Sequence, residues 1–304
     1  MGLGTNHVTV TTAATFIPEI WSDEIVAAYK KSLVMANLVK KMSFKGKKGD
    51  TVRIPAPTRG DATAKTAGNQ VNLIAATEGD IVVSIASHFE YSRLIEDIVE
   101  AQALSSLRSF YTDDAGFALG KRVDSSLIQL GRGARSGNAA NQAYTGGIIG
   151  STGVAYTSGT SNAAAIADAG IRKAIQLLDD QDVPMDGRSL VVPPVARNSM
   201  LGIARFTEQA FKGTGSTLIN GEFGDLYGVK VYVSTNCDTA AGNSTTDRVG
   251  LMFHRDAMVL VEQIGVRAQT QYKQEYLGTL FTADTLYGVS ELRDTSIVPI
   301  VIPA

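Results

Sequence analysis

The sequence predicts an α+β protein with one long helix and one long β-hairpin. Apolar residues recur at helical spacing over residues 103–131, and no proline lies between Thr58 and Val183. Residues 44–90 contain two strand-like stretches around a long polar segment. From Gly265 onward, polar and small or apolar residues alternate as in a sheet with one face in water. A chain of 304 residues is long enough to hold all three features in one large domain or two smaller ones.

The N-terminal region is predicted to be an arm followed by an amphipathic helix. Residues 1–16 are polar and lack periodicity, which favours an extended arm or a disordered terminus. Pro18 can open a helix, because proline fits the first helical turn. Apolar residues such as Trp21 and Leu33 then recur at helical spacing. We expect a helix over 18–42 whose apolar stripe covers either its own core or a neighbouring subunit.

The next region is predicted to be a hairpin with a long tip. Residues 45–50 form a turn, residues 51–54 alternate as a strand, and residues 55–70 are small and polar. A second strand begins at Asp80 and continues towards Tyr91. Because a two-stranded hairpin is only marginally stable alone, this one is expected to need a partner surface.

Two helices are predicted after the hairpin. Leu94 and Val99 belong to a first apolar block, which predicts a short helix. Residues 103–131 predict the long helix, and the segment Gly131–Gly133 ends it.

The middle of the chain predicts a mixed α/β unit. Residues 132–162 are irregular, with short strands around Ile148 and Ile149. Asn162 can cap a helix, whose buried face runs through Leu178. The further elements are a buried strand at 188–192, a helix from Ala196 to Ile203, a turn and strand at 223–234, a polar loop at 238–247, a buried strand at 248–253 and a short helix from His254.

Composition excludes several classes of protein. The net charge is −2, so the basic excess typical of nucleic-acid-binding proteins is absent. The single cysteine, Cys237, cannot form an internal disulfide and suits a reducing compartment. No apolar run is long enough for a membrane helix, and the N-terminus lacks the pattern of a signal peptide. A cytoplasmic setting is expected.

The histidines and glycine-rich segments do not predict a metal or cofactor site. His7, His88 and His254 are far apart and lack the spacing of metal ligands. The segment Gly116–Lys121 is one residue short of a phosphate loop and lies inside the predicted long helix. The segment Gly147–Gly153 does not match the dinucleotide fingerprint. No cofactor is predicted.

The charged clusters are not interpreted as catalytic sites either. Glu90, Glu96, Asp97 and Glu100 have helical spacing at a strand-to-helix junction, which favours a solvated face over paired catalytic carboxylates. The basic cluster Lys45, Lys47 and Lys48 is either a solvated turn or a contact for an acidic neighbour. The sequon at Asn243 has no meaning in a cytoplasmic protein. No catalytic residue is predicted, and the chain is not expected to be an enzyme.

The order of elements, together with several short stretches, carries a resemblance to a known family. These stretches are Phe89–Asp97, Val123–Leu127, Gly187–Pro194, Gly228–Ser234, Phe253–Ala257 and Leu286–Val289 with Leu292–Arg293. In this order and spacing they resemble the major capsid protein of tailed bacteriophages, which has the Hong Kong 97 fold. The resemblance covers essentially the whole chain.

The resemblance implies how the chain is divided. Residues 1–43 would be the N-terminal arm and helix, 44–90 the extended hairpin called the E-loop, and 91–162 a peripheral domain with a long spine helix. Residues 163–262 would be the axial domain. Residues 263–304 would be strands that return to the peripheral domain.

The resemblance also implies function and partners. Copies of the chain would assemble into hexamers and pentamers that form an icosahedral shell around double-stranded DNA, with a portal at one vertex. The E-loop and arm would reach adjacent subunits, and repeated weak contacts would become strong together. The DNA would be a lumenal neighbour without sequence-specific binding, and no membrane is implied. Assembly would take place in the cytoplasm of a bacterial host, and the product would be the virion capsid.

Two departures from the founding member of the family matter. The fold-like pattern begins near residue 17, which leaves no room for a fused scaffolding segment, so a separate scaffolding protein is expected. Lys65 lies near the hairpin tip, but neither it nor a partner asparagine matches the motif for a covalent cross-link. Non-covalent contacts, with or without a decoration protein, would then hold the shell together.

Two alternatives remain at this point. A cellular nanocompartment shares the capsid fold, but it would need cargo-binding features that the sequence does not display. An ordinary cytoplasmic enzyme of mixed structure would need a catalytic constellation, and it would leave the long hairpin unexplained.

Overall fold

The computed structural model describes residues 35–57, 60, 62–68, 70–71, 73, 78–97, 106–134, 147–156, 162–203, 225–237 and 247–303. The predicted arm over 1–16, most of the predicted helix over 18–42 and most of the loop over 238–247 lie outside these residues.

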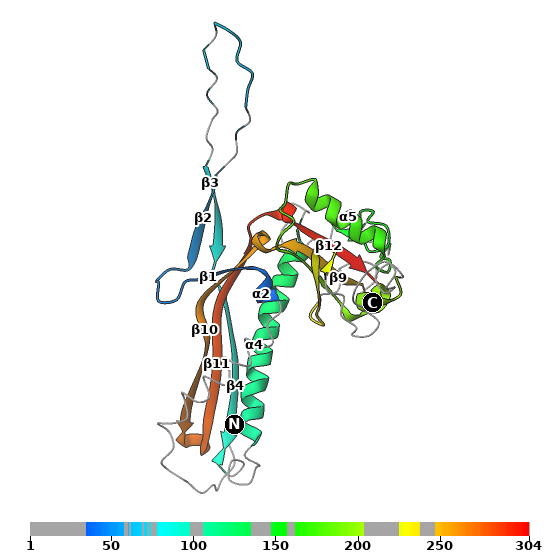
Figure 1. Ribbon diagram of the computed structural model, residues 1–304. Coiled ribbons are helices and arrows are strands. Elements are labelled where there is room, and N and C mark those ends of the chain that lie inside the picture. Colours follow the sequence, from blue (N-terminus) through cyan, green and yellow to red (C-terminus); the bar gives the residue numbers. More distant parts are fainter. Residues whose placement is uncertain are drawn as a thin grey trace.

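A four-stranded sheet and a long helix form the elongated half of the protein. The sheet has the order β1 (Lys40–Ser43), β10 (Met258–Lys273), β11 (Gly278–Glu291) and β4 (Ser87–Glu96). Strand β1 pairs with β10 in parallel, and the other pairs are antiparallel. The helix α4 (Ser106–Arg132) runs along this sheet (Figure 1). It confirms the long helix predicted over 103–131.

A six-stranded sheet forms the second half. Its order is β5 (Ile148–Ile149), β12 (Ile297–Ile302), β9 (Arg248–His254), β6 (Arg188–Val192), β8 (Val229–Val233) and β7 (Asp225–Leu226). The helices α5 (Asp168–Asp179) and α6 (Pro194–Leu201) belong to the same half. All six residues of β12 are buried, as expected for a strand that is covered on both faces.

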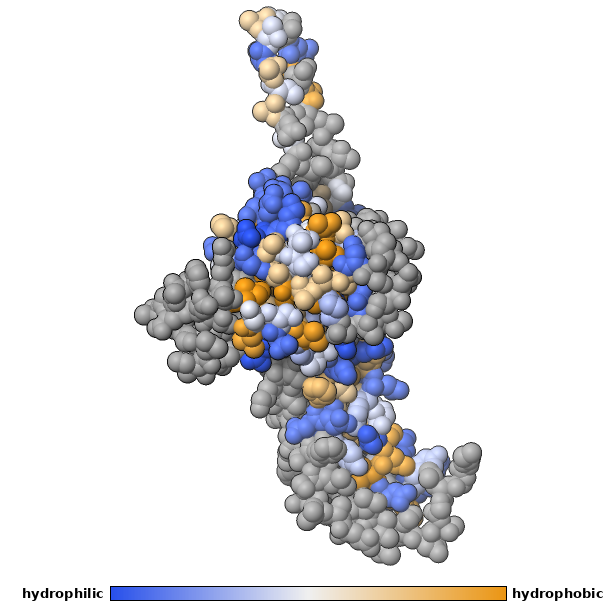
Figure 2. Space-filling view, turned by 90° about the vertical axis from the view of Figure 1, so that its right-hand side faces the viewer, coloured by the Kyte–Doolittle hydropathy of each residue, from blue (hydrophilic) through white to orange (hydrophobic). Residues whose placement is uncertain are grey.

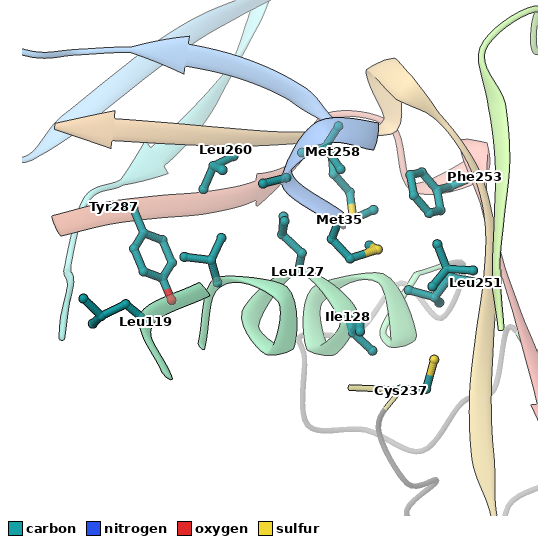
Figure 3. Close-up of a cluster of buried hydrophobic side chains, with 14 of the residues drawn as sticks. Met35, Leu119, Leu127, Ile128, Cys237, Leu251, Phe253, Met258, Leu260 and Tyr287 are labelled. Carbon is teal, nitrogen blue, oxygen red and sulfur yellow. The ribbon is translucent and has the colours of Figure 1, made fainter. Parts of the chain in front are cut away.

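The two faces of this second sheet belong to two different cores. Side chains alternate between the faces of a strand. Val191 of β6 and Leu251 of β9 join a core that contains α4. The adjacent residues, Leu190 and Met252, join a core that contains α5 and α6. The first core therefore packs α4 against both sheets, and Figure 3 shows this junction, with Leu127 of α4 beside Met35 and Met258.

Two short connections link the two sheets, and they lie next to each other. The chain passes from β9 to β10 through the short helix η1 (Arg255–Ala257) and from β11 to β12 through η3 (Asp294–Ser296). The N–H groups of Leu292 and Arg293 both donate to the Ala257 carbonyl oxygen, at 2.8 and 3.2 Å. A further short helix, η2 (Gln274–Tyr276), connects β10 to β11.

A separate two-stranded sheet confirms the predicted hairpin, although its second strand ends at Ser84 and the residues from Ser87 to Tyr91 belong to β4. Strands β2 (Thr51–Pro57) and β3 (Glu78–Ser84) pair in antiparallel fashion. The hairpin extends away from both halves (Figure 1). Before it, the single turn α2 (Met35–Leu38) leads into β1.

Several elements differ from the predictions, each because of a tertiary contact. The helix predicted over 18–42 includes β1, which is a strand because it pairs with β10. The residues around Leu94, predicted to be helical, continue β4 to Glu96 because they pair with β11. The helix predicted from Asn162 begins at Asp168 instead, after the Ala167 N–H donates to the Gly150 carbonyl oxygen at 3.0 Å.

The strands predicted over 263–304 divide between the two sheets. Strand β12 pairs with β9 and β5, so it belongs to the six-stranded sheet. Strand β10 starts at Met258 rather than after residue 262.

Candidate assembly surfaces

The base of the hairpin is fixed to the four-stranded sheet. Val83 and Ile85 are buried against Val259 and Val261 of β10. The backbones also approach closely, because a Cβ atom placed on Gly288 of β11 would lie 2.4 Å from the Ser84 carbonyl oxygen. The hairpin thus has a rigid attachment at its base.

Apolar side chains are exposed on the outer part of the hairpin. Leu73 is 93% exposed and Val71 is 61% exposed, and Val82 on β3 is 46% exposed. Figure 2 shows the hairpin standing clear of the body, with hydrophobic positions among hydrophilic ones. Exposed apolar positions on a projecting element favour contact with another molecule.

A run of exposed lysines lies between α2 and the hairpin. Its members are Lys40, Lys41, Lys45, Lys47 and Lys48. Lys47 lies over the Phe44 ring at 5.5 Å from its centroid. The Gln263 amide donates to the carbonyl oxygens of Lys47 and Gly49, which holds the turn against β10. The predicted basic cluster is therefore an ordered, exposed turn. This position suits both predicted roles, a solvated turn and a contact for an acidic neighbour.

A cleft of about 600 Å³ lies where this lysine run meets the second half of the protein. Lys40, Arg255, Asp186 and Asp256 contribute charges of both signs to its lining. His254 also lines it and accepts a hydrogen bond from the Asp256 N–H through Nδ1, at 3.1 Å. The cleft has no nucleophile with an adjacent base, which acyl or phosphoryl chemistry would need.

A buried carboxylate joins three segments of the chain. Asp124 of α4 is fully buried. Its Oδ1 accepts from the Met35 N–H at 3.2 Å, and its Oδ2 accepts from the Asn236 amide at 3.4 Å. The sequence signal for this site is a charged residue between the apolar positions Val123 and Leu127, and it does not by itself predict the site.

A second charge cluster lies on the four-stranded sheet. Arg267 donates to both carboxylate oxygens of Asp284, at 2.7 and 3.0 Å, and His88 Nε2 lies 3.1 Å from Oδ2. Burial raises the pKa of Asp284, but the hydrogen bonds from Arg267 and His88 outweigh it and lower this pKa below its usual value. The cluster fixes the pairing of β4, β10 and β11. His88 thus links β4 to Asp284 on β11.

The remaining motifs occupy structural positions. Gly116 and Gly120 lie inside α4, where a phosphate loop cannot form. Gly150 packs against α5, since a Cβ on Gly170 would lie 1.9 Å from its carbonyl oxygen. Asp97 accepts a hydrogen bond from the Tyr272 hydroxyl at 2.9 Å.

The acidic residues of the predicted strand-to-helix junction lie on a strand instead of a helix. Glu90 is exposed on β4, and Glu96 ends that strand. Glu100, His7 and Asn243 lie outside the described residues. Within the described ranges, no group of three His, Cys, Asp or Glu residues could hold a metal ion. None of the helices in these ranges is long and apolar enough to cross a membrane.

Comparisons with known proteins identify what this chain is similar to. A family model described as phage capsid protein matches residues 29–300. A chain from Mycobacterium phage Che8 has a TM-score of 0.68 and 22% identity, over 98% of both chains. A capsid chain of cyanophage P-SCSP1u has a TM-score of 0.70 and 18% identity, over 99% of this chain and 92% of that one. For the mature capsid of bacteriophage PhiM1 the values are 0.67 and 13%, over 99% and 92%. No curated protein matches the sequence.

Proposed function

This chain belongs to the phage capsid protein family, and we propose that it is the major shell subunit of a tailed-phage head, built from hexamers and pentamers around double-stranded DNA. The single observation that carries the proposal is the hairpin β2–β3. It is anchored rigidly at its base, extends away from the body and exposes Leu73 and Val71. An isolated subunit gains nothing from such an element, whereas a subunit in a shell can place it on a neighbour.

The proposed division of the chain follows the Hong Kong 97 pattern. The hairpin within 44–90 is the E-loop, and α4 is the spine helix. The four-stranded sheet is the core of the peripheral domain, and the six-stranded sheet with α5 and α6 is the core of the axial domain. Residues 1–43 would form the arm that reaches neighbouring subunits. The sheet memberships support moving β12 from the peripheral group to the axial group.

The partners follow from the same proposal. A separate scaffolding protein would guide assembly in the cytoplasm of the bacterial host, and a portal would occupy one vertex. DNA would be retained in the lumen by confinement, consistent with the net charge of −2. The family match favours the phage shell over an ordinary enzyme. A cellular nanocompartment is the second candidate, and the diameter of the assembled particle would distinguish it from a phage head.

Negative-stain electron microscopy of the purified full chain tests the proposal. The chain is expressed with and without a candidate scaffolding protein encoded beside it. Closed shells or sheets of hexamers are expected, and a persistent monomer or small dimer under both conditions would contradict the proposal. A control variant replaces residues 58–77 with Asn-Gly, which suits a two-residue hairpin turn. It should fold like the full chain, since this segment lies beyond the hairpin base, but it should not form closed shells.

A further inference from the structure

Two long strand edges of the four-stranded sheet have no paired strand within the described part of the chain. In an antiparallel pair, alternate residues direct their N–H and C=O groups to the partner, and the residues between direct them outward. The Asp97 N–H donates to the Leu277 carbonyl oxygen at 3.1 Å, one step beyond the ladder of β4 and β11. Odd-numbered residues of β11 therefore face β4, and its even-numbered residues face β10.

The outward-facing positions of β10 follow from this alternation. Thr282 pairs with Gln269, and Leu280 pairs with Gln271, so the backbones of Gln269 and Gln271 face β11. The residues between them, such as Thr270, direct their N–H and C=O groups to the outer edge. Strand β1 already occupies the first part of this edge, from Val259 to Glu262. No strand in the described part of the chain pairs with the remainder, residues 266–273.

The hairpin also has one strand edge that keeps all of its backbone donors for pairing with another strand. The Ile85 N–H donates to the Asp50 carbonyl oxygen at 2.8 Å, just below the ladder of β2 and β3. By the same alternation, Pro55 and Pro57 fall at outward positions of β2. Proline has no N–H, so the outer edge of β2 lacks two donors. The outer edge of β3, which includes Val82, keeps all of its donors.

Length matches these two edges. Strand β3 has seven residues, which fits the open stretch 266–273. Charged side chains on both edges already have partners within the subunit, since Arg53 donates to Asp80 at 2.8 Å and Arg267 to Asp284 at 2.7 Å. The match between the edges therefore rests on length and on the backbone groups.

The other open edge is a poorer match. Strand β4 lies against α4, because the Tyr91 hydroxyl donates to Asp114 at 2.7 Å and Arg122 lies over the Phe89 ring. Figure 1 shows β10 on the side of the sheet away from that helix.

We propose that β3 of one copy pairs with the open edge of β10, residues 266–273, in an adjacent copy. The hairpin would thus be held by backbone hydrogen bonds as an added strand, in addition to the contacts of its apolar side chains. Both edges would be covered by the same event, which removes two sites of uncontrolled pairing. The inference rests on the proposed shell function, and it names the surface that receives the hairpin.

Paired proline substitutions test the proposal. T270P removes an outward N–H of β10 and should leave the ladder with β11 intact. S92P is the matched control, because Ser92 is also a hydroxyl residue at an outward position, but on β4. V82P on β3 and Thr51→Pro on β2 form the corresponding pair on the hairpin. Circular dichroism and thermal unfolding establish that each variant folds.

The expected result is that T270P and V82P raise the protein concentration needed for shell formation by at least about tenfold, while S92P and Thr51→Pro assemble like the wild type. Equal assembly of all four variants, or a defect confined to S92P, would overturn the inference while the shell function stands. Failure of the wild type to form shells would overturn the shell function and this inference with it.

Hydrogen exchange gives an independent measurement on the unmodified protein. The outward amides of β10 and β3, such as those of Thr270 and Val82, should become protected when subunits assemble, whereas the outward amide of Ser92 on β4 should change less. Protection of the Thr270 amide already present in the unassembled subunit would overturn the inference, because the chain would then cover this edge itself.

Discussion

At the scale of single residues, Asp124 has the most demanding position. It is fully buried and accepts hydrogen bonds from Met35 and Asn236. Removal of a buried acceptor leaves its donors unsatisfied. Asp124→Ala should therefore lower the free energy of unfolding by about 2–3 kcal/mol, measured by urea denaturation of the subunit. Asp113→Ala, an exposed change on the same helix, should stay within about 0.5 kcal/mol. Similar losses in the two variants would contradict the role of Asp124.

Glu291 makes stability depend on pH. Burial, with a contribution from Asp294, raises the pKa of Glu291 to about 7. An unfolded carboxyl ionises near pH 4.3, so the unfolded state releases its proton first and stability falls between about pH 4.5 and 7. Glu291→Gln should therefore stabilise the subunit at pH 8, by about 1–2 kcal/mol because the side chain is partly exposed, and should have little effect at pH 4.5. Urea midpoints at both pH values measure this, with the exposed Glu275→Gln as the control.

At the scale of elements, the contact between α5 and the turn after β5 is set by two glycines. A Cβ on Gly170 would lie 1.9 Å from the Gly150 carbonyl oxygen, and a backbone atom cannot move aside cheaply. Gly170→Ala should destabilise the subunit by about 1–3 kcal/mol, despite the better helix propensity of alanine. Thermal unfolding measures the effect. Gly202→Ala, where the nearest atom lies at 3.4 Å, should be nearly neutral, and equal effects at the two positions would rule out this explanation.

The elements that the sequence predicted well are those whose pattern is local. Helix α4 and strands β6 and β9 follow from continuous apolar periodicity, and the hairpin follows from a polar tip between two alternating stretches. Residues 40–42 and the block that begins at Leu94 are predicted to be helical because their apolar spacing is ambiguous over a few residues. Their strand conformation depends on β10 and β11, which lie more than 150 residues later in the chain. Sheet membership, such as that of β12, depends on the same long-range pairing.

The assembly surfaces could be predicted only in part. The need of the hairpin for a partner follows from its polar tip and its small size, which the sequence displays. The cluster joins His88 to Asp284, 196 residues later, and to Arg267 on the neighbouring strand, and no local pattern indicates this pairing. The open edge of β10 depends on which strands pair with it, which no local pattern encodes.

At the scale of the whole molecule, α4 couples the two halves. Its residues share one core with both sheets. Leu127→Ala, in that shared core, should cost about 2–5 kcal/mol and weaken hydrogen-exchange protection in both sheets. Leu178→Ala, in the core formed with α5, should weaken the six-stranded sheet more than the four-stranded one. Peptide-resolved exchange in urea measures both, and identical profiles for the two variants would contradict the coupling.

The only sulfhydryl group of the chain is also withdrawn from water. Cys237 is 4% exposed and lies in the core beside α4. In a folded subunit, a maleimide dye should therefore react with a cysteine introduced at an exposed position, such as Lys48, and leave Cys237 untouched. One dye per subunit would make the fluorescence of a purified particle a direct count of the chains within it.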